Sequence, residues 1–179
     1  MEVKNRRFFA ALLAAVLVAM APAIYASNGA KSRGTIEDQV RHELAMLPYY
    51  NVFDDLSFRV DNGAVTLFGE VTQPVVKDDA VRAVKHVEGV TAVNDQIEVL
   101  PLSPFDNQIR RSAYRAIYGF PALQRYAMGV VPSIHIIVKN GHVTLEGVVA
   151  TEQDKQMAFK RANSVPNVFS VENHLQVQS

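Results

Sequence analysis

Apolar and polar residues alternate along this chain with two different periods. Helical spacing of apolar residues predicts a helix over 36–47, which Pro48 ends. Alternation at every second position over 56–71, on either side of Asn62-Gly63, predicts a β-hairpin with a tight turn. Helical spacing returns over 74–87, and an apolar strand follows over 93–100. The predicted order is therefore helix, strand, strand, helix, strand.

The whole pattern occurs twice. The heptapeptide VTLFGEV at 65–71 returns as VTLEGVV at 143–149, a shift of 78 residues. The first helix aligns at a shift of 73, so the second copy has five extra residues between its first helix and its first strand. We expect an α+β fold of two tandem α-β-β-α-β units, each a small three-stranded mixed sheet covered by two helices.

The N-terminus has the order of a secretory signal peptide. Three basic residues precede an uncharged apolar stretch over 8–20, and small residues that suit cleavage follow, of which Ala26 is the expected last residue removed. The alternative is an uncleaved membrane anchor, because the apolar stretch approaches the length that spans a bilayer. The expected segments are a signal peptide (1–26), a linker (27–34), a first domain (35–100), a second linker (101–105) and a second domain (106–178).

Charge and cysteine content remove several classes of function. The 18 basic and 18 acidic residues give a formal net charge of zero, which argues against a nucleic-acid partner. The chain contains no cysteine, which excludes disulfides, thiolate zinc sites, cysteine nucleophiles and a lipid-modified cysteine.

The repeated motif resembles the BON domain family. The residues that carry the resemblance are the NG-x-VTL-x-G-x-V hairpins, Lys77 and Lys155 in the following helix, and a closing V-x-G-V-x-x-V pattern. The second copy departs from this pattern, because Pro166-Asn167 stands where the first has Glu88-Gly89. The resemblance covers about 35–100 and 106–178. It implies an exported, periplasmic envelope protein without catalytic activity, associated with phospholipid surfaces, envelope integrity, osmotic stress and, in some members, chaperoning.

Arginine and tyrosine gather on the first helix of the second copy, opposite its apolar face. Arginine pairs with phosphate and tyrosine suits the headgroup region, so this helix and the segment after it predict a site for anionic phospholipid. The residues of this predicted site are Arg110, Arg111, Tyr114, Arg115, Tyr118, Arg125 and Tyr126. The corresponding face of the first copy has Arg41 and His42 but no tyrosine, which favours the second copy as the binding half. The alternative is an ordinary solvated helix, followed by a loop folded onto the first domain.

Catalytic and metal-binding patterns are weak. His135 would face Glu146 across the second hairpin, and His142 lies too far along the strand to complete a site. We expect a cross-strand polar pair on a solvated sheet face, and no catalytic residue, metal or cofactor.

The resulting hypothesis is a non-enzymatic periplasmic protein that binds anionic phospholipid peripherally and supports envelope integrity or stress tolerance. One alternative is a periplasmic chaperone that holds unfolded exported proteins against Leu123, Tyr126, Met128, Val130 and Val131. Another is a module that docks on an envelope protein through its free sheet faces. The sequence leaves the oligomeric state open.

Overall fold

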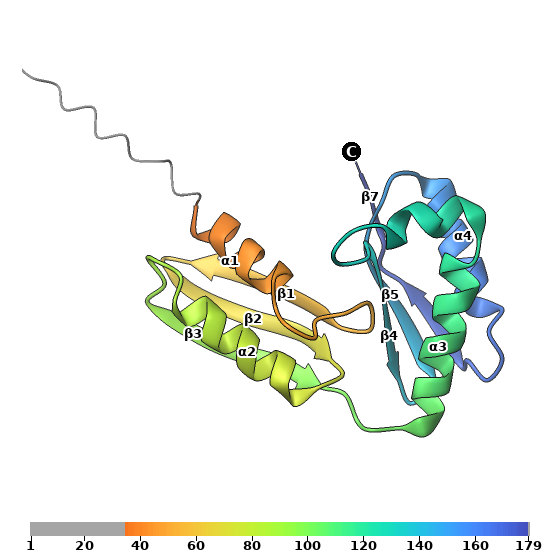
Figure 1. The fold of residues 1–179 in the computed structure, drawn as a ribbon, viewed down its shortest axis with the longest axis horizontal. Coiled ribbons are helices and arrows are strands. Elements are labelled where there is room, and N and C mark those ends of the chain that lie inside the picture. Colours follow the sequence, from red (N-terminus) through yellow and green to blue (C-terminus); the bar gives the residue numbers. More distant parts are fainter. Residues whose placement is uncertain (1–34, 179) are drawn as a thin grey trace, which may run out of the picture. The chain divides into compact units, whose positions relative to one another are not determined.

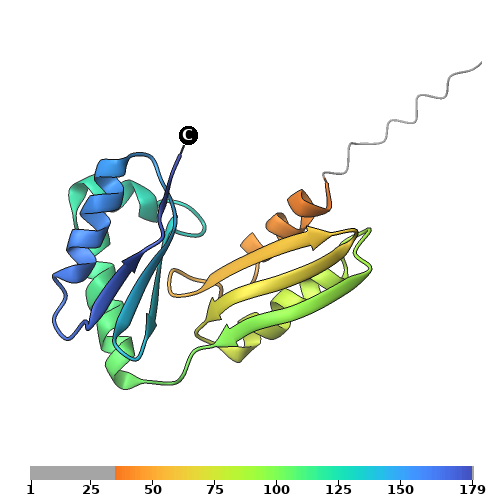
Figure 2. The same cartoon turned by 180° about the vertical axis from the view of Figure 1, so that it is seen from behind.

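The computed structural model describes residues 35–178, and within them the chain builds the same succession of elements twice (Figure 1). The fold is α+β, with two tandem units of order helix, strand, strand, helix, strand, as the repeat predicted. The helices of each unit cover one face of its sheet (Figures 1 and 2). The predicted signal peptide and the linker over 27–34 lie outside the described residues.

The first unit begins at Thr35. Its hydroxyl accepts a hydrogen bond from the Asp38 backbone N–H, while the Asp38 carboxylate accepts one from the Thr35 N–H. This capping box satisfies two N–H groups at the helix start. In the sheet, β2 is central, antiparallel to β1 and parallel to β3. The elements are α1 (Ile36–Ala45), β1 (Asp55–Asp61), β2 (Ala64–Val71), α2 (Pro74–Lys85) and β3 (Ala92–Val99).

The second unit extends this plan. Helix α3 begins more than one turn before the position equivalent to the start of α1, and the inserted segment after α3 forms a 3-10 helix, η1. The last strand is divided into β6 and β7, both parallel to β5, so this sheet has four strands where three were predicted. The elements are α3 (Pro104–Tyr118), η1 (Pro121–Ala127), β4 (Ile134–Lys139), β5 (His142–Val149), α4 (Glu152–Asn163), β6 (Ser170–Asn173) and β7 (Gln176–Val177).

Glycine is required at two kinds of position in the hairpins. Both Asn-Gly turns have positive φ at their two residues, 50° and 83° in the first and 53° and 81° in the second. Within the strands, a Cβ on Gly69 would lie 2.3 Å from the Asp55 carbonyl oxygen, and one on Gly147 2.1 Å from that of Ser133. The neighbour that excludes a side chain is therefore the backbone of the paired segment, not a helix.

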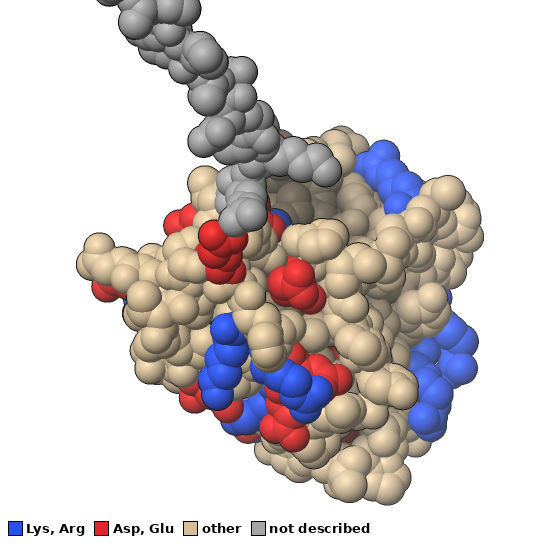
Figure 3. Space-filling model, turned by 60° about the vertical axis from the view of Figure 1, so that its left-hand side comes forward, with Lys and Arg blue, Asp and Glu red and all other residues tan. Residues whose placement is uncertain are grey.

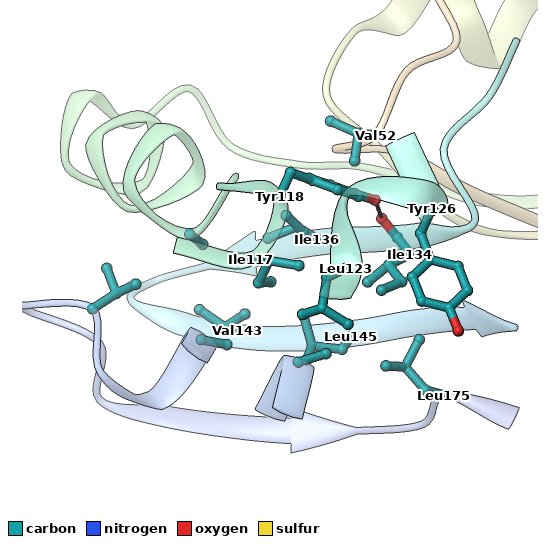
Figure 4. Close-up of a cluster of buried hydrophobic side chains, with 14 of the residues drawn as sticks. Val52, Ile117, Tyr118, Leu123, Tyr126, Ile134, Ile136, Val143, Leu145 and Leu175 are labelled. Carbon is teal, nitrogen blue, oxygen red and sulfur yellow. Dashed lines mark hydrogen bonds between the residues drawn. The ribbon is translucent and has the colours of Figure 1, made fainter. Parts of the chain in front are cut away.

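Each unit has its own hydrophobic core between sheet and helices. The first contains Val40 and Leu44 from α1, Val65 and Leu67 from β2, and Val76, Ala80 and Val84 from α2. The second is shown in Figure 4 and contains Ile109, Ile117, Leu123, Ile134, Ile136, Val143, Leu145 and Leu175. Val52, in the loop before β1, also belongs to this second core, and its carbonyl accepts a hydrogen bond from the Ile136 N–H at 2.8 Å.

Candidate functional site

Helix α3 carries most of the predicted lipid-binding residues, and its hydrophobic spacing decides which of them reach the surface. Ser103 caps its start by accepting from the Asp106 N–H. The buried stripe runs along the side formed by Ile109, Ala113 and Ile117. Only side chains away from that stripe are available to a ligand.

Three of the predicted residues are exposed together on this helix: Arg111, Tyr114 and Arg115. With Phe53 they line a shallow depression of about 260 Å³. The Tyr114 ring meets the Phe53 ring edge-on, with the ring centroids 6.3 Å apart. The two guanidinium groups thus flank an aromatic surface, an arrangement that suits a phosphate with an apolar neighbour.

Arg110 was predicted on this face, and that prediction is wrong. It lies four residues after the buried Asp106 and three before the buried Ala113, so it faces the protein interior. Its guanidinium donates to the Asn107 side-chain oxygen at 2.7 Å and to the Val138 carbonyl at 2.6 Å. Burial lowers the pKa of Arg110, and its Nε has no partner among the described residues. Arg110 therefore joins α3 to β4 and does not lie on the exposed face of the helix.

Tyr118 and Tyr126 were also predicted at the lipid boundary, and both are buried instead (Figure 4). The Tyr118 hydroxyl donates to the Ile134 carbonyl at 2.5 Å, and burial raises the pKa of this tyrosine. The Tyr126 hydroxyl donates to the Asp154 carboxylate and accepts from the Ala150 N–H. A tyrosine can be buried when its hydroxyl finds a partner, and both rings complete the second core in this way.

Arg125 is exposed, but its guanidinium already has partners within the protein. Its guanidinium pairs with Asp154 and donates to the Tyr126 hydroxyl. Burial opposes ionisation of Asp154, but hydrogen bonds from Thr151, Tyr126 and Arg125 outweigh it and lower the pKa of Asp154. Arg125 therefore fixes η1 to the start of α4 and is a weaker candidate for binding anions than Arg111 or Arg115.

The structure adds two basic residues that the sequence reasoning missed, Lys160 and Arg161 near the end of α4. In the first unit, the equivalent residues at the repeat shift are Arg82 and Ala83. They line one groove together with Asp38 and His42, which are equivalent to Arg111 and Arg115. Among the described residues, no carboxylate lies within ion-pair distance of these four cations. The Arg161 guanidinium stacks over the Phe120 ring at 4.0 Å. We call Arg111, Arg115, Lys160 and Arg161 the basic face.

The first unit has a different surface at the equivalent place. A groove of about 720 Å³ runs between α1 and α2, lined by Asp38, His42, Glu43, Asp79 and Arg82, among others. Arg82 pairs with Asp79 at 2.9 Å, and Arg41 pairs with Asp38 at 3.3 Å. Figure 3 shows acidic and basic side chains side by side in the middle of this view of the surface. The groove therefore has no surplus of positive charge for an anion.

The segment proposed to hold unfolded chains is divided between core and surface. Leu123 and Tyr126 are buried, whereas Met128 and Val130 are exposed. Burial of Leu123 and Tyr126 leaves a much smaller apolar surface than the sequence suggested.

His135 and Glu146 are directly opposite each other on β4 and β5, in the predicted register. His135 is buried and not solvated, because its ring stacks on Tyr50 and its Nδ1 lies 2.5 Å from the Asp54 carbonyl oxygen. Glu146 bonds instead to His174 at 2.6 Å. Within residues 35–178, no three His, Cys, Asp or Glu side chains are grouped closely enough to hold a metal ion. No helix in this range is long and apolar enough to cross a membrane.

Comparison with known proteins identifies the domain to which the repeated motif belongs. The family model of the BON domain matches residues 32–101 and 127–179. Osmotically-inducible protein Y of Escherichia coli K12 is 30% identical over 132 residues, which are 69% of this chain and 62% of that protein. The chain thus spans less than two thirds of this relative.

Two solved structures from Chlamydia trachomatis also align. CdsD, a structural protein of the type III secretion system, is 12% identical with a TM-score of 0.32, over 80% of this chain and 92% of that one. Its C-terminal domain is 12% identical with a TM-score of 0.29, over 81% and 98%. The two matched segments, the duplicated hairpins and the two α-β-β-α-β units together establish that this chain belongs to the BON domain family.

Proposed function

We propose that this protein is an exported, non-enzymatic envelope protein that adsorbs to anionic phospholipid surfaces through the basic face of its second unit. The observation that carries this proposal is the set of four cations on α3 and α4 without a carboxylate partner among the described residues. Helix α3 contains one carboxylate, Asp106, which is buried. Unpaired arginine and lysine are attracted to anionic lipid without first breaking an ion pair.

Export and the envelope location are supported by the N-terminal pattern of basic, apolar and small residues. A role in stress tolerance is supported by the relative in Escherichia coli, which is described as osmotically inducible. Peripheral adsorption requires no spanning helix, and Tyr114 supplies an amphipathic ring beside the basic face.

The test is binding of the protein, without the predicted signal peptide, to sedimented vesicles. Neutral phosphatidylcholine vesicles are compared with vesicles containing phosphatidylglycerol, at low and near-physiological salt. The triple variant Arg111→Gln/Arg115→Gln/Lys160→Gln removes three charges. At about 1 kcal/mol for each charge near an anionic surface, its affinity should fall on the order of a hundredfold.

A matched control removes the same number of charges from the first unit, in Arg59→Gln/Arg82→Gln/Lys85→Gln. All three control residues are exposed. The control should keep most of its binding to phosphatidylglycerol vesicles. Equal losses in both triple variants would show a general charge effect and refute the basic face. Binding that is unchanged by added salt would also contradict the proposal, because ion pairing at a surface is screened.

Holding unfolded exported chains is the second candidate function, supported by the exposed Met128 and Val130. It predicts suppression of client aggregation that does not depend on salt. The double variant Met128→Ser/Val130→Ser should then lose this suppression while vesicle binding stays unchanged. An unchanged aggregation rate at equimolar protein would rule this function out.

A further inference from the structure

A second surface of interest lies where α3 begins and the loop after α4 ends. Phe169 is 69% exposed and Phe105 is 40% exposed, with their ring centroids 6.0 Å apart. Leu102, three residues before Phe105, is 93% exposed. We call the ring pair of Phe105 and Phe169 the aromatic tip, and Leu102 precedes it closely in the sequence on the Phe105 side. Exposed apolar side chains that gather in this way mark an interaction surface.

The base of the aromatic tip is held in place. The Asp106 carboxylate accepts hydrogen bonds from the N–H groups of Asn140 and Gly141, at 3.0 and 2.8 Å, which joins the start of α3 to the second hairpin turn. The Phe169 ring lies directly over Gly141, since a Cβ there would be 2.7 Å from the ring. The hydrogen bonds between Asp106 and the turn thus fix the backbone against which the Phe169 ring packs.

The first unit lacks this feature. At the repeat shift, the counterpart of Phe169 is Thr91, which lies beside Gly63 as Phe169 lies beside Gly141. Thr91 is exposed and has no aromatic ring to contribute. The exposed rings therefore occur on the same unit as the basic face.

The basic face indicates what the aromatic tip contacts. Arg111 follows Phe105 by six residues on α3, about 9 Å along the helix axis at 1.5 Å per residue. Phe169 follows the last residue of α4 by six residues, and α4 carries Lys160 and Arg161 near this end. Unpaired cations next to exposed aromatic rings are the composition of a surface that binds anionic lipid and inserts apolar groups beneath the headgroups.

We infer that the aromatic tip inserts into the acyl region of an anionic bilayer while the basic face contacts the headgroups. This inference rests on the proposed lipid binding and adds to it a defined point of penetration. Each inserted phenylalanine ring adds affinity that salt does not screen. Binding should consequently have a salt-sensitive part from the basic face and a salt-resistant part from the tip.

The chain contains no tryptophan, so one introduced tryptophan reports on its own surroundings. In Phe169→Trp, fluorescence should shift to the blue on binding phosphatidylglycerol vesicles and lose intensity when the acyl chains are brominated. Tyr49→Trp and Met128→Trp serve as controls, at positions that are 68% and 86% exposed. Both should keep their emission, since they lie outside the tip.

The outcomes separate this inference from the proposal on which it depends. Vesicles that sediment with the Phe169→Trp protein but leave Trp emission unquenched would overturn insertion and leave lipid adsorption standing. Failure to sediment would overturn both. Quenching in Met128→Trp alone would identify the loop at 128–130 as the inserting element. A blue shift of the Phe169→Trp protein that depends on its concentration, without vesicles, would identify a second copy as the partner and overturn insertion.

A pair of double variants measures the contribution to affinity. Phe105→Ser/Phe169→Ser should weaken vesicle binding by on the order of tenfold for each ring and make the remainder fully salt-sensitive. The control Tyr49→Ser/Phe68→Ser removes two aromatic rings that are 68% and 39% exposed in the first unit. It should leave binding unchanged. Equal effects in both pairs would refute a specific tip.

Discussion

The two units share one fold and differ on their helix surfaces. In the first, α1 and α2 carry five carboxylates among their charges, and Arg41 and Arg82 are held in ion pairs. In the second, α3 and α4 carry three carboxylates, of which Asp106 and Asp154 are buried. The repeat shows that a duplicated unit can keep its core and turns while the solvent-facing positions change independently. Surface positions outside special features change stability little, so they are free to acquire a different role.

The largest effects are expected in the cores, where the two units are most alike. Leu67 and Leu145 are equivalent, fully buried residues on β2 and β5. Leu67→Ala and Leu145→Ala should each lower the free energy of unfolding by about 2–5 kcal/mol, through lost burial and the cavity left behind. Chemical denaturation followed by circular dichroism measures both. A loss under 1 kcal/mol in either variant would contradict the buried placement of that leucine.

Acid titration should affect the two units with opposite sign. In the first, the register places Asp55, Glu70 and Glu98 side by side across three strands. Burial, then the neighbouring Asp55 and Glu98, raise the pKa of Glu70 above its ordinary 4.5. The folded chain therefore binds this proton more readily than the unfolded chain, and the ionised Glu70 destabilises the fold at neutral pH. The cost disappears as the pH falls through the raised pKa.

Asp154 in the second unit behaves in the reverse way. Its pKa lies below the ordinary 3.8, so its contribution to stability is present above that pH and is lost as the pH falls through the lowered value. At pH 7, Asp154→Asn should lower the free energy of unfolding by about 1–3 kcal/mol, because Tyr126 and Arg125 lose a charged partner. Glu70→Gln should raise the melting temperature at pH 7 and give no gain at pH 4. Melting curves of both variants across this range measure the signs, and a shift of the same sign in both at pH 7 would contradict these environments.

A last pair of variants tests whether the surface difference alone separates the units. Asp38→Arg/His42→Arg gives the first unit the arginines that the second has at Arg111 and Arg115. Vesicle affinity should rise by about 1 kcal/mol for each charge gained. The control Asp61→Arg/Asn94→Arg makes the same charge change at exposed positions on β1 and β3. An equal rise in the control would show that total charge, and not its place on the helices, controls adsorption.

Much of the fold could be predicted because its signals are local. The Asn-Gly turns determine the hairpin register, including the pairs His135 with Glu146 and Lys139 with His142. The division of the last strand had no such local signal. In the second unit, the His174 N–H donates to the Leu145 carbonyl between β6 and β7, so pairing with β5 continues although the strand is interrupted.

The candidate site was predicted only in part. The exposure of Arg111, Tyr114 and Arg115 could be predicted from helix spacing, whereas the burial of Arg110 depends on the Val138 carbonyl, 28 residues away in the sequence. Lys160 and Arg161 could have been found by carrying the repeat shift onto the helix surface. The burial of Tyr118 and Tyr126 could not be predicted, because it depends on hydrogen-bond acceptors at Ile134 and Asp154, which are distant in the sequence.

The sequence by itself determined the duplication, the order of elements and the hairpin turns, because periodicity and Asn-Gly geometry act over a few neighbouring residues. Only the tertiary structure decided which polar side chains form internal hydrogen bonds and which face solvent. The insertion after α3 shows why. Its extra residues form η1, which places Leu123 in the second core and joins Arg125 and Tyr126 to Asp154. A buried hydroxyl or guanidinium needs a partner, and that partner is brought by the fold from elsewhere in the chain.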